Sequence, residues 1–259
     1  MIRFASIGSG SQGNCLVVES TDGMKTTRVL IDCGFPIRRT LERLTALGIE
    51  PSTLTGILIS HEHLDHIRGA PSLARRFNIP LWMNSGTHKA SRKKLSPGWV
   101  NVFDSHAPFE LGNFQVTPIP IPHDAREPVQ FHLTDGNHKL VNLTDLGAIT
   151  PFIAQISAGC DAMVIECNHD LDMLKNGKYH AALKRRVAGQ LGHLSNDAAS
   201  DFVASIHHPK LQHLVAAHLS QENNLPELAQ AALAKAVGAG VSEIEIASQA
   251  EGFNWRHLM

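Results

Sequence analysis

The sequence contains few cysteines and few aromatic residues, and it carries almost no net charge. Four of the 259 residues are cysteine, and no two of them form a CxxC pair. Cysteines so sparse, in largely apolar surroundings, favour buried reduced thiols over disulfides or a zinc ribbon. A net charge of −1 excludes a basic field over the whole surface. Any affinity for nucleic acid must therefore be local.

Long hydrophobic runs are also missing. No run approaches the roughly 18 residues needed to cross a bilayer. Gly and Ser interrupt residues 1–14 before they could form the apolar part of an export signal. We therefore expect a soluble cytoplasmic protein with no membrane association. Because 43% of the residues are hydrophobic, the chain can bury a substantial core, and we expect one domain over residues 1–259.

Short apolar segments alternate with helical patterns along the chain. Residues 2–7, 15–19 and 28–32 are separated by turn residues and predict an antiparallel meander. Further strands are expected at residues 56–60, 81–83, 114–121, 129–134, 139–143, 162–167 and 242–248. Helices are expected at residues 37–47, 70–77, 87–94 and 150–158, and after Ser195 and Asn224 as N-terminal caps, the second with Glu227 at capping-box spacing. Strands with one apolar face, joined by amphipathic helices, predict a layered α/β sandwich.

The densest group of metal-ligand residue types is the segment HEHLDH, residues 61–66, directly after an expected strand. His61 and His63 are two residues apart, so in an extended chain their side chains point to the same side. Asp65 and His66 follow as the chain turns and can reach a second ion. Imidazole and carboxylate bind zinc, manganese or iron, and four such groups in six residues favour a metal site over a solvated polar turn.

Three further ligand types follow apolar strands at a distance in the sequence. His123 follows residues 114–121, Asp145 follows residues 139–143, and His218 follows residues 214–217. Taken singly, each is more often a structural residue with satisfied hydrogen bonds. Together with the HEHLDH segment, they predict a site for two divalent metal ions.

The segment HEHLDH resembles the HxHxDH signature of the metallo-β-lactamase superfamily. Asp32 in LIDCG, His123, Asp145 in LTDLG and His218 in AAHLS resemble the remaining motifs of that superfamily in their usual order. The resemblance implies a four-layer αββα sandwich. Because the chain is short, we expect no large inserted domain.

The same resemblance implies how the ligands are divided. One ion would be held by His61, His63 and His123, and the other by Asp65, His66 and His218. Asp145 would bridge the two ions opposite a hydroxide that serves as the nucleophile. Asp32 would orient the ligands from behind, and the catalytic roles would fall to Asp65, Asp145 and His193.

The segments GHLSN at residues 192–196 and HLS at residues 218–220 resemble paired motifs of ribonuclease Z and its relatives. His193 could bind the scissile phosphate or protonate the leaving oxygen. The residues 4–20, ECNHD at 166–170 and HLSQENN at 218–224 are similar to the YycJ/WalJ-like exonucleases of the superfamily. This similarity implies 5′ to 3′ exonuclease action on DNA. Ser195, His169 and Asn14 are the candidates for substrate binding, although a helix cap is the more economical interpretation of Ser195, and a structural role is as good an interpretation of His169.

Two alternatives remain open from the sequence. The first is a hydrolase of the same fold that acts on a β-lactam, thioester or lactone, because the fold alone does not determine the substrate. A metal-binding or redox-sensing protein without hydrolytic activity is the second alternative. Two basic clusters, Lys89 with residues 92–94 and Lys184 with residues 185–186, are interpreted as solvated helix faces, with a contact to a phosphate backbone as the alternative.

Overall fold

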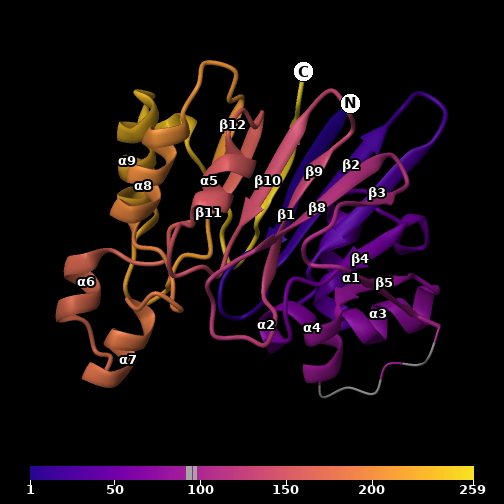
Figure 1. The fold of residues 1–259 in the computed structure, drawn as a ribbon, viewed down its shortest axis with the longest axis horizontal. Coiled ribbons are helices and arrows are strands. Elements are labelled where there is room, and N and C mark those ends of the chain that lie inside the picture. Colours follow the sequence, from indigo (N-terminus) through magenta and orange to yellow (C-terminus); the bar gives the residue numbers. More distant parts are fainter. Residues whose placement is uncertain (92–94, 96–97) are drawn as a thin grey trace.

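The structure is a computed structural model that describes residues 1–91, 95 and 98–259. Its strands form two seven-stranded sheets. The sheets face each other, and helices cover both outer sides (Figure 1). The four-layer αββα sandwich expected from the sequence is therefore confirmed. Within the described part of the chain, none of the helices combines the length and apolar character needed to cross a bilayer.

The first sheet has the strand order β14-β1-β2-β3-β4-β5-β6. Its strands are β1 (Ile2–Gly8), β2 (Cys15–Thr21), β3 (Thr26–Ile31), β4 (Gly56–Leu58), β5 (Leu81–Asn84), β6 (Val100–Phe103) and β14 (Phe253–His257). β1, β2 and β3 pair antiparallel, which confirms the expected meander. β3 to β6 pair parallel because helical segments connect β3 to β4, β4 to β5 and β5 to β6.

The second sheet has the order β13-β12-β11-β10-β9-β8-β7. Its strands are β7 (Phe109–Leu111), β8 (Phe114–Pro120), β9 (Val129–Thr134), β10 (Lys139–Leu143), β11 (Ala162–Glu166), β12 (His213–Ala217) and β13 (Glu245–Ile246). β10 to β13 pair parallel. The C-terminal ends of these parallel strands consequently lie at one edge of the sheet.

The described helices divide between the two outer layers and the edge of the sandwich. They are α1 (Ile37–Ala46), η1 (Pro51–Thr53), α2 (Leu64–Ile67), α3 (Ala70–Phe77), α4 (Ser85–Ala90), α5 (Pro151–Ser157), α6 (Leu171–Asn176), α7 (Ala181–Val187), α8 (Asn196–Ile206), α9 (Pro226–Val237) and η2 (Val241–Glu243). α1 and α3 lie on the side of the first sheet, and α8 and α9 on the side of the second (Figure 1).

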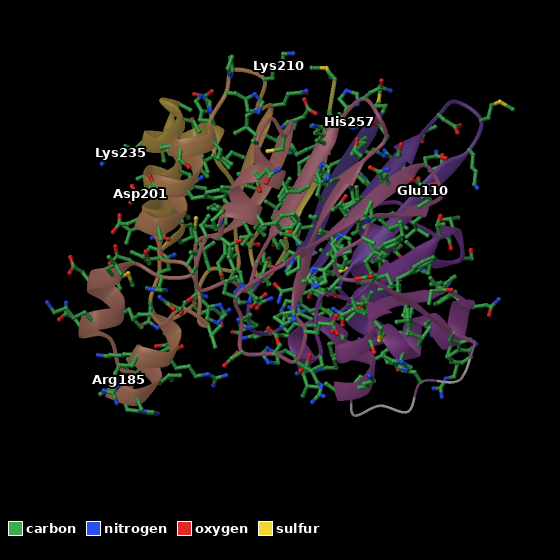
Figure 2. All side chains as sticks on the ribbon, in the orientation of Figure 1. Glu110, Arg185, Asp201, Lys210, Lys235 and His257 are labelled. Atoms are coloured by element: carbon green, nitrogen blue, oxygen red, sulfur yellow. The ribbon has the colours of Figure 1, made fainter. Side chains whose placement is uncertain are left out.

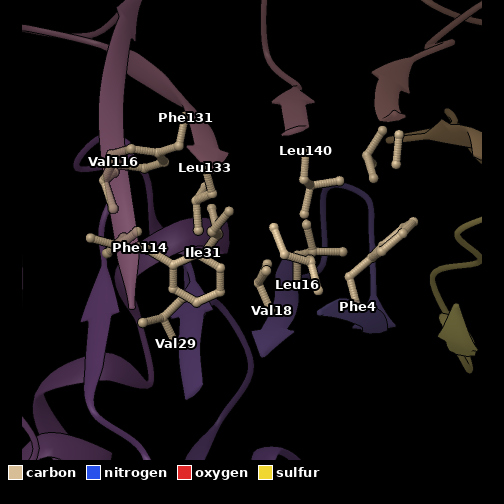
Figure 3. Packing of buried hydrophobic residues seen from close by; sticks show 14 of the residues in the cluster. Phe4, Leu16, Val18, Val29, Ile31, Phe114, Val116, Phe131, Leu133 and Leu140 are labelled. Atoms are coloured by element: carbon tan, nitrogen blue, oxygen red, sulfur yellow. The ribbon is translucent and has the colours of Figure 1, made fainter. Parts of the chain in front are cut away.

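The hydrophobic core has three parts that match these layers. The largest fills the space between the two sheets, where side chains of the first sheet, such as Val29, lie against side chains of the second, such as Phe114 (Figure 3). Two further clusters pack the helices onto the outer faces of the sheets. The four cysteines are buried, and no two of them form a disulfide, as expected.

The structure corrects three expectations about the elements. The capping box at Asn224 is wrong: Leu225 is the N-terminal cap of α9, and the Asn224 amide instead donates to the Cys167 carbonyl and to Asn196. The closing strand over residues 242–248 is reduced to the two residues of β13, because the turn η2 occupies its beginning. Of the helix expected at residues 87–94, α4 accounts for the first part, and Arg92, Lys93 and Lys94 lie outside the described residues.

Candidate metal centre

Three carboxylate and imidazole side chains reach the centre from strands that end in left-handed backbone. Asp32 and His218 directly follow β3 and β12, and Asp145 lies two residues beyond β10. Their φ angles are 61°, 54° and 59°. Asn78 is the one other non-glycine residue with positive φ in the described part of the chain. Such backbone is uncommon for non-glycine residues and is retained where the surrounding structure holds it, often at functional sites.

His61, His63 and His123 form the first ligand group. Each offers one nitrogen, and these atoms all lie within 4.8 Å of one another. His61 follows β4 in the chain, and His63 is the N-terminal cap of α2. The His123 Nδ1 donates to the Gly192 carbonyl at 3.3 Å, which leaves its Nε2 without a proton in the neutral ring.

The tautomer of His61 follows from its neighbour Ser60. The single hydroxyl proton of Ser60 goes to Asp32 Oδ2 at 2.9 Å, because a carboxylate only accepts. The Ser60 oxygen can therefore accept from His61 Nδ1 at 2.9 Å. His61 Nε2 is then a bare acceptor that faces the first group, as a metal ligand requires.

Asp65, His66, Asp145 and His218 form the second ligand group, whose candidate atoms also lie within 4.8 Å of one another. A buried carboxylate stands behind each of its two histidines. Asp32 Oδ2 accepts from His66 Nδ1 at 2.7 Å, and Glu166 Oε1 accepts from His218 Nδ1 at 2.9 Å. Carboxylates in this position orient a metal-binding imidazole and raise its basicity.

The electrostatic environments of the two groups are opposite. Burial lowers the pKa of His61 well below its usual value, and it also lowers that of His123. Burial also disfavours the charged forms of His66 and His218, but Asp145 and the other nearby carboxylates outweigh it. They raise the pKa of His66 well above its usual value and that of His218 to about 10. The neutral form is therefore favoured for His61 and His123 of the first group, whereas the carboxylates favour the charged form of His66 and His218 in the second.

Buried atoms without partners test whether the site fits a metal. Among the described residues, His61 Nε2, Asp145 Oδ2 and His218 Nε2 are buried and have no hydrogen-bond partner. Asp145 Oδ2 lies only 3.0 Å from His66 Nε2. Two bare acceptors at this distance repel each other unless a proton or a cation lies between them. The donor set of nitrogen and carboxylate oxygen therefore fits divalent cations.

His193 and Glu166 stand beside the second group. Glu166 ends the buried strand β11, and its Oε1 accepts from His193 Nδ1 at 2.8 Å as well as from His218. Burial alone would raise the pKa of Glu166, but the two imidazoles lower it to about 2. Glu166 in turn outweighs burial and raises the pKa of His193. No role for Glu166 was predicted from the sequence, although a carboxylate at the end of an otherwise apolar strand indicates a possible buried partner.

The three residues expected to bind substrate are almost fully buried. The exposed fractions of Asn14, His169 and Ser195 are 6%, 1% and 8%. The Ser195 hydroxyl accepts from the Ala198 amide at 3.1 Å and caps α8, as one of the two interpretations expected. The Asn14 amide lies 3.1 Å from His66 Nε2, within reach of the second ligand group. Their contact with a substrate stays a prediction.

Comparisons with known proteins agree with this geometry. Residues 27–218 match the model of the β-lactamase superfamily domain. The chain is 31% identical to the exodeoxyribonuclease YycJ of Bacillus anthracis over 93% of this chain and 92% of that one. It is 32% identical to the exodeoxyribonuclease WalJ of Streptococcus pneumoniae over 88% of this chain and 85% of that one. Among solved structures, the metallo-β-lactamase fold protein YhfI of Bacillus subtilis superposes with a TM-score of 0.76 at 18% identity, covering 99% of this chain and 100% of that one.

Proposed function

The chain belongs to the β-lactamase superfamily and is a metal-dependent hydrolase of that fold, and from this premise we propose that it is a dinuclear phosphodiesterase that degrades DNA from the 5′ end. In this proposal His61, His63 and His123 hold one ion. Asp65, His66 and His218 hold the other, and Asp145 is shared. The ions would be zinc or manganese, with iron as a further candidate, because this donor set accepts all three.

Two divalent ions in these groups would lower the pKa of a coordinated water towards 7 and polarise the phosphoryl oxygen. The protein's own residues supply the rest. Asp32 and Glu166 hold His66 and His218 with Nε2 towards the centre. The rings of His61 and His123 stay neutral, which suits metal ligands.

The observation that carries the proposal is the position of His193. Its Nδ1 is held by Glu166 at 2.8 Å, and its ring stacks on that of His218 with the centroids 5.3 Å apart. The raised pKa favours the protonated imidazole, and its side chain is 22% exposed. A protonated imidazole at the edge of a phosphodiester site can donate to the leaving oxygen. The two curated relatives named as exodeoxyribonucleases support DNA as the substrate.

The test is hydrolysis of 5′-phosphorylated DNA, single- and double-stranded, by protein loaded with manganese or zinc. We expect a 5′ label to be released as short products before a 3′ label. The Asp65→Ala variant lacks a ligand of the second group, and any hydrolysis it shows is attributed to contaminating nuclease. DNA that wild-type protein leaves as intact as Asp65→Ala does would contradict the proposal. Earlier release of the 3′ label would contradict only the proposed 5′ to 3′ direction of digestion.

His193→Gln separates the proton donor from the metal ligands. It keeps a polar side chain but cannot carry the positive charge, so we expect turnover to fall by about 100-fold with metal content unchanged. Faster hydrolysis of nitrocefin or of an acyl-glutathione than of DNA would instead favour the alternative substrates. Colour from redox-active iron without any turnover would favour the non-hydrolytic alternative. We further propose that residues 1–259 act as one domain in the cytoplasm.

A further inference from the structure

The segment of residues 171–187, here called the α6–α7 arm, differs in charge from the rest of the chain. It contains one acidic residue, Asp172, and five basic ones, Lys175, Lys178, Lys184, Arg185 and Arg186. Because the whole chain has a net charge of −1, the remainder is net negative. The arm is therefore a local basic region on a chain whose remaining residues carry a net negative charge.

Core packing does not explain the α6–α7 arm. α7 has no buried residue, and Leu174 is the one buried residue of α6. In Figure 1 the two helices lie apart from α8 and α9, at the lower left of the view. A helix that is exposed all round and polar is stabilised little by burial. The basic side chains of the arm are consequently not needed for core packing.

The arm contacts the loops that carry ligands of both groups. Near its C-terminal end, Arg186 Nε donates to Asp124 Oδ2 at 2.8 Å, and Asp124 directly follows His123. On the other side, Lys178 Nζ lies 3.5 Å from Glu222 Oε2 in the loop that follows His218.

A cavity of about 150 Å³ adjoins this arrangement. Its lining includes Leu183 and Arg186 of the arm together with His193. The arm therefore lies beside the metal centre, and the cavity extends from the arm to His193, the proposed proton donor. A chain that enters the centre past His193 would pass Arg186 of the arm.

We propose that the α6–α7 arm binds the phosphate backbone of the DNA strand whose end occupies the metal centre, an inference that rests on the proposed function. Arg186 and Lys178 already pair with Asp124 and Glu222. For Lys175, Lys184 and Arg185, no ion pair with an acid is found in the part of the chain that the structure describes. These three cations provide the charge, and the backbone phosphates of nucleic acid provide the complementary charge whatever the base sequence.

The test compares two triple variants of equal charge change. K175Q/K184Q/R185Q removes the three cations of the arm. K25Q/K210Q/K235Q removes three exposed lysines elsewhere, and Figure 2 shows Lys210 and Lys235 far from Arg185. The metal-loaded proteins are titrated against a fluorescein-labelled 20-residue oligodeoxythymidylate with a phosphorothioate backbone, followed by anisotropy between about 50 and 200 mM salt. Circular dichroism checks that both variants are folded.

We expect the arm variant to bind at least about tenfold more weakly, with a salt slope smaller by about 2, since each phosphate contact to a single strand contributes about 0.7. The distal variant is expected to bind within about twofold of wild type. Equal losses in both variants, or no loss in the arm variant, would overturn the proposal. Displacement of the DNA by polyglutamate as readily as by unlabelled oligonucleotide would also overturn it and indicate an acidic protein partner.

Hydrolysis of bis(p-nitrophenyl) phosphate distinguishes this inference from the proposed function. This small diester cannot reach the arm, so the arm variant is expected to hydrolyse it at the wild-type rate while its DNA cleavage falls. A protein that binds DNA through the arm but cleaves no phosphodiester would retain this inference and refute the proposed function. Slower hydrolysis of the small diester by the arm variant would refute a role limited to backbone binding.

Discussion

The two ligand groups of the candidate metal centre use the same side-chain types in opposite electrostatic settings. The histidines of the first group are oriented by neutral partners, the Ser60 hydroxyl for His61 and the Gly192 carbonyl for His123. Those of the second group are oriented by the buried carboxylates Asp32 and Glu166. Burial, assisted by the neighbouring histidines, favours the neutral imidazole in the first group, whereas in the second group nearby carboxylates favour the charged form.

The two ligand groups differ in how many carboxylates they contain. The first group contributes no carboxylate of its own, so the positive charge of an ion there would remain available to a substrate oxygen. The second group has Asp65 and Asp145 at the centre and two further carboxylates behind its histidines. It would therefore neutralise an ion more completely. We expect the phosphate of a substrate to be attracted mainly by the first group.

The largest effect is expected from Asp145, which would join the two groups. Asp145→Asn keeps the shape and tolerates the left-handed backbone, because asparagine adopts positive φ more readily than most residues. It removes the shared charge, and we expect turnover on DNA to fall by about a thousandfold or more. Elemental analysis of protein purified without chelator should show loss of metal from both groups.

His63→Ala is the matched comparison for Asp145→Asn. It removes a ligand of the first group alone, so the second group should keep its ion. Equal metal content in Asp145→Asn and wild type would show that Asp145 is not shared between ions. Complete loss of metal in His63→Ala would show that the two groups do not bind independently.

A smaller effect is expected from the carboxylates behind the histidines. Glu166→Gln removes the charged acceptor of both His193 and His218, and removing such a partner typically lowers metal affinity or activity 10- to 100-fold. Asp32→Asn makes the same change behind His66, and it also removes the charged acceptor of the Ser60 hydroxyl that orients His61. We expect Glu166→Gln to lower turnover with saturating metal, and Asp32→Asn to be rescued by added metal. Rescue of both variants by metal would mean that Glu166 acts only through His218.

Much of the fold could be predicted from the sequence because periodicity records which face of an element is buried. The meander β1 to β3 and helices such as α3 have clear apolar patterns and turn residues at their ends. The helix α6 was missed, and α7 was expected only as a solvated helix face at residues 184–186, because both bury almost nothing and so have no apolar face to recognise. The strand β14 was missed because it pairs with β1, about 250 residues away in the chain. Pairing between such distant segments leaves no local pattern in the sequence.

For the site, the sequence supplied the groups but not their environment. Ligand types at strand ends were sufficient to single out His61, Asp145 and His218, and the structure places His61 in the first ligand group and the other two in the second. The role of Glu166 depends on two imidazoles that lie 27 and 52 residues further along the chain. Hydrogen-bond partners at such separations are set by the tertiary fold, which is why the charge difference between the two groups could not be foreseen.

His132 on β9 is a buried histidine outside the two ligand groups, and it serves as the reference for their histidines. Its replacement is expected to have the smallest effect on the site. Its ring is 7% exposed, and among the described residues neither ring nitrogen has a hydrogen-bond partner. Burial, with a smaller contribution from Lys139, lowers its pKa to about 4. The unfolded chain, with a pKa of about 6.5, therefore takes up the proton first as the pH falls. Stability that is fully present above about pH 6.5 should be lost progressively towards pH 4, by about 2 kcal/mol between pH 7 and pH 5.

His132→Leu should abolish that part of the acid sensitivity, because leucine has no proton to bind and suits an apolar position. Urea unfolding of both proteins at pH 7 and pH 5 measures it. We expect similar stability at pH 7, a more stable variant at pH 5, and unchanged turnover at neutral pH. Parallel stability curves for the two proteins would mean that the His132 ring finds water or a polar partner. Burial alone would then be insufficient to keep an imidazole neutral in this protein, and the neutrality of the first ligand group would need another cause.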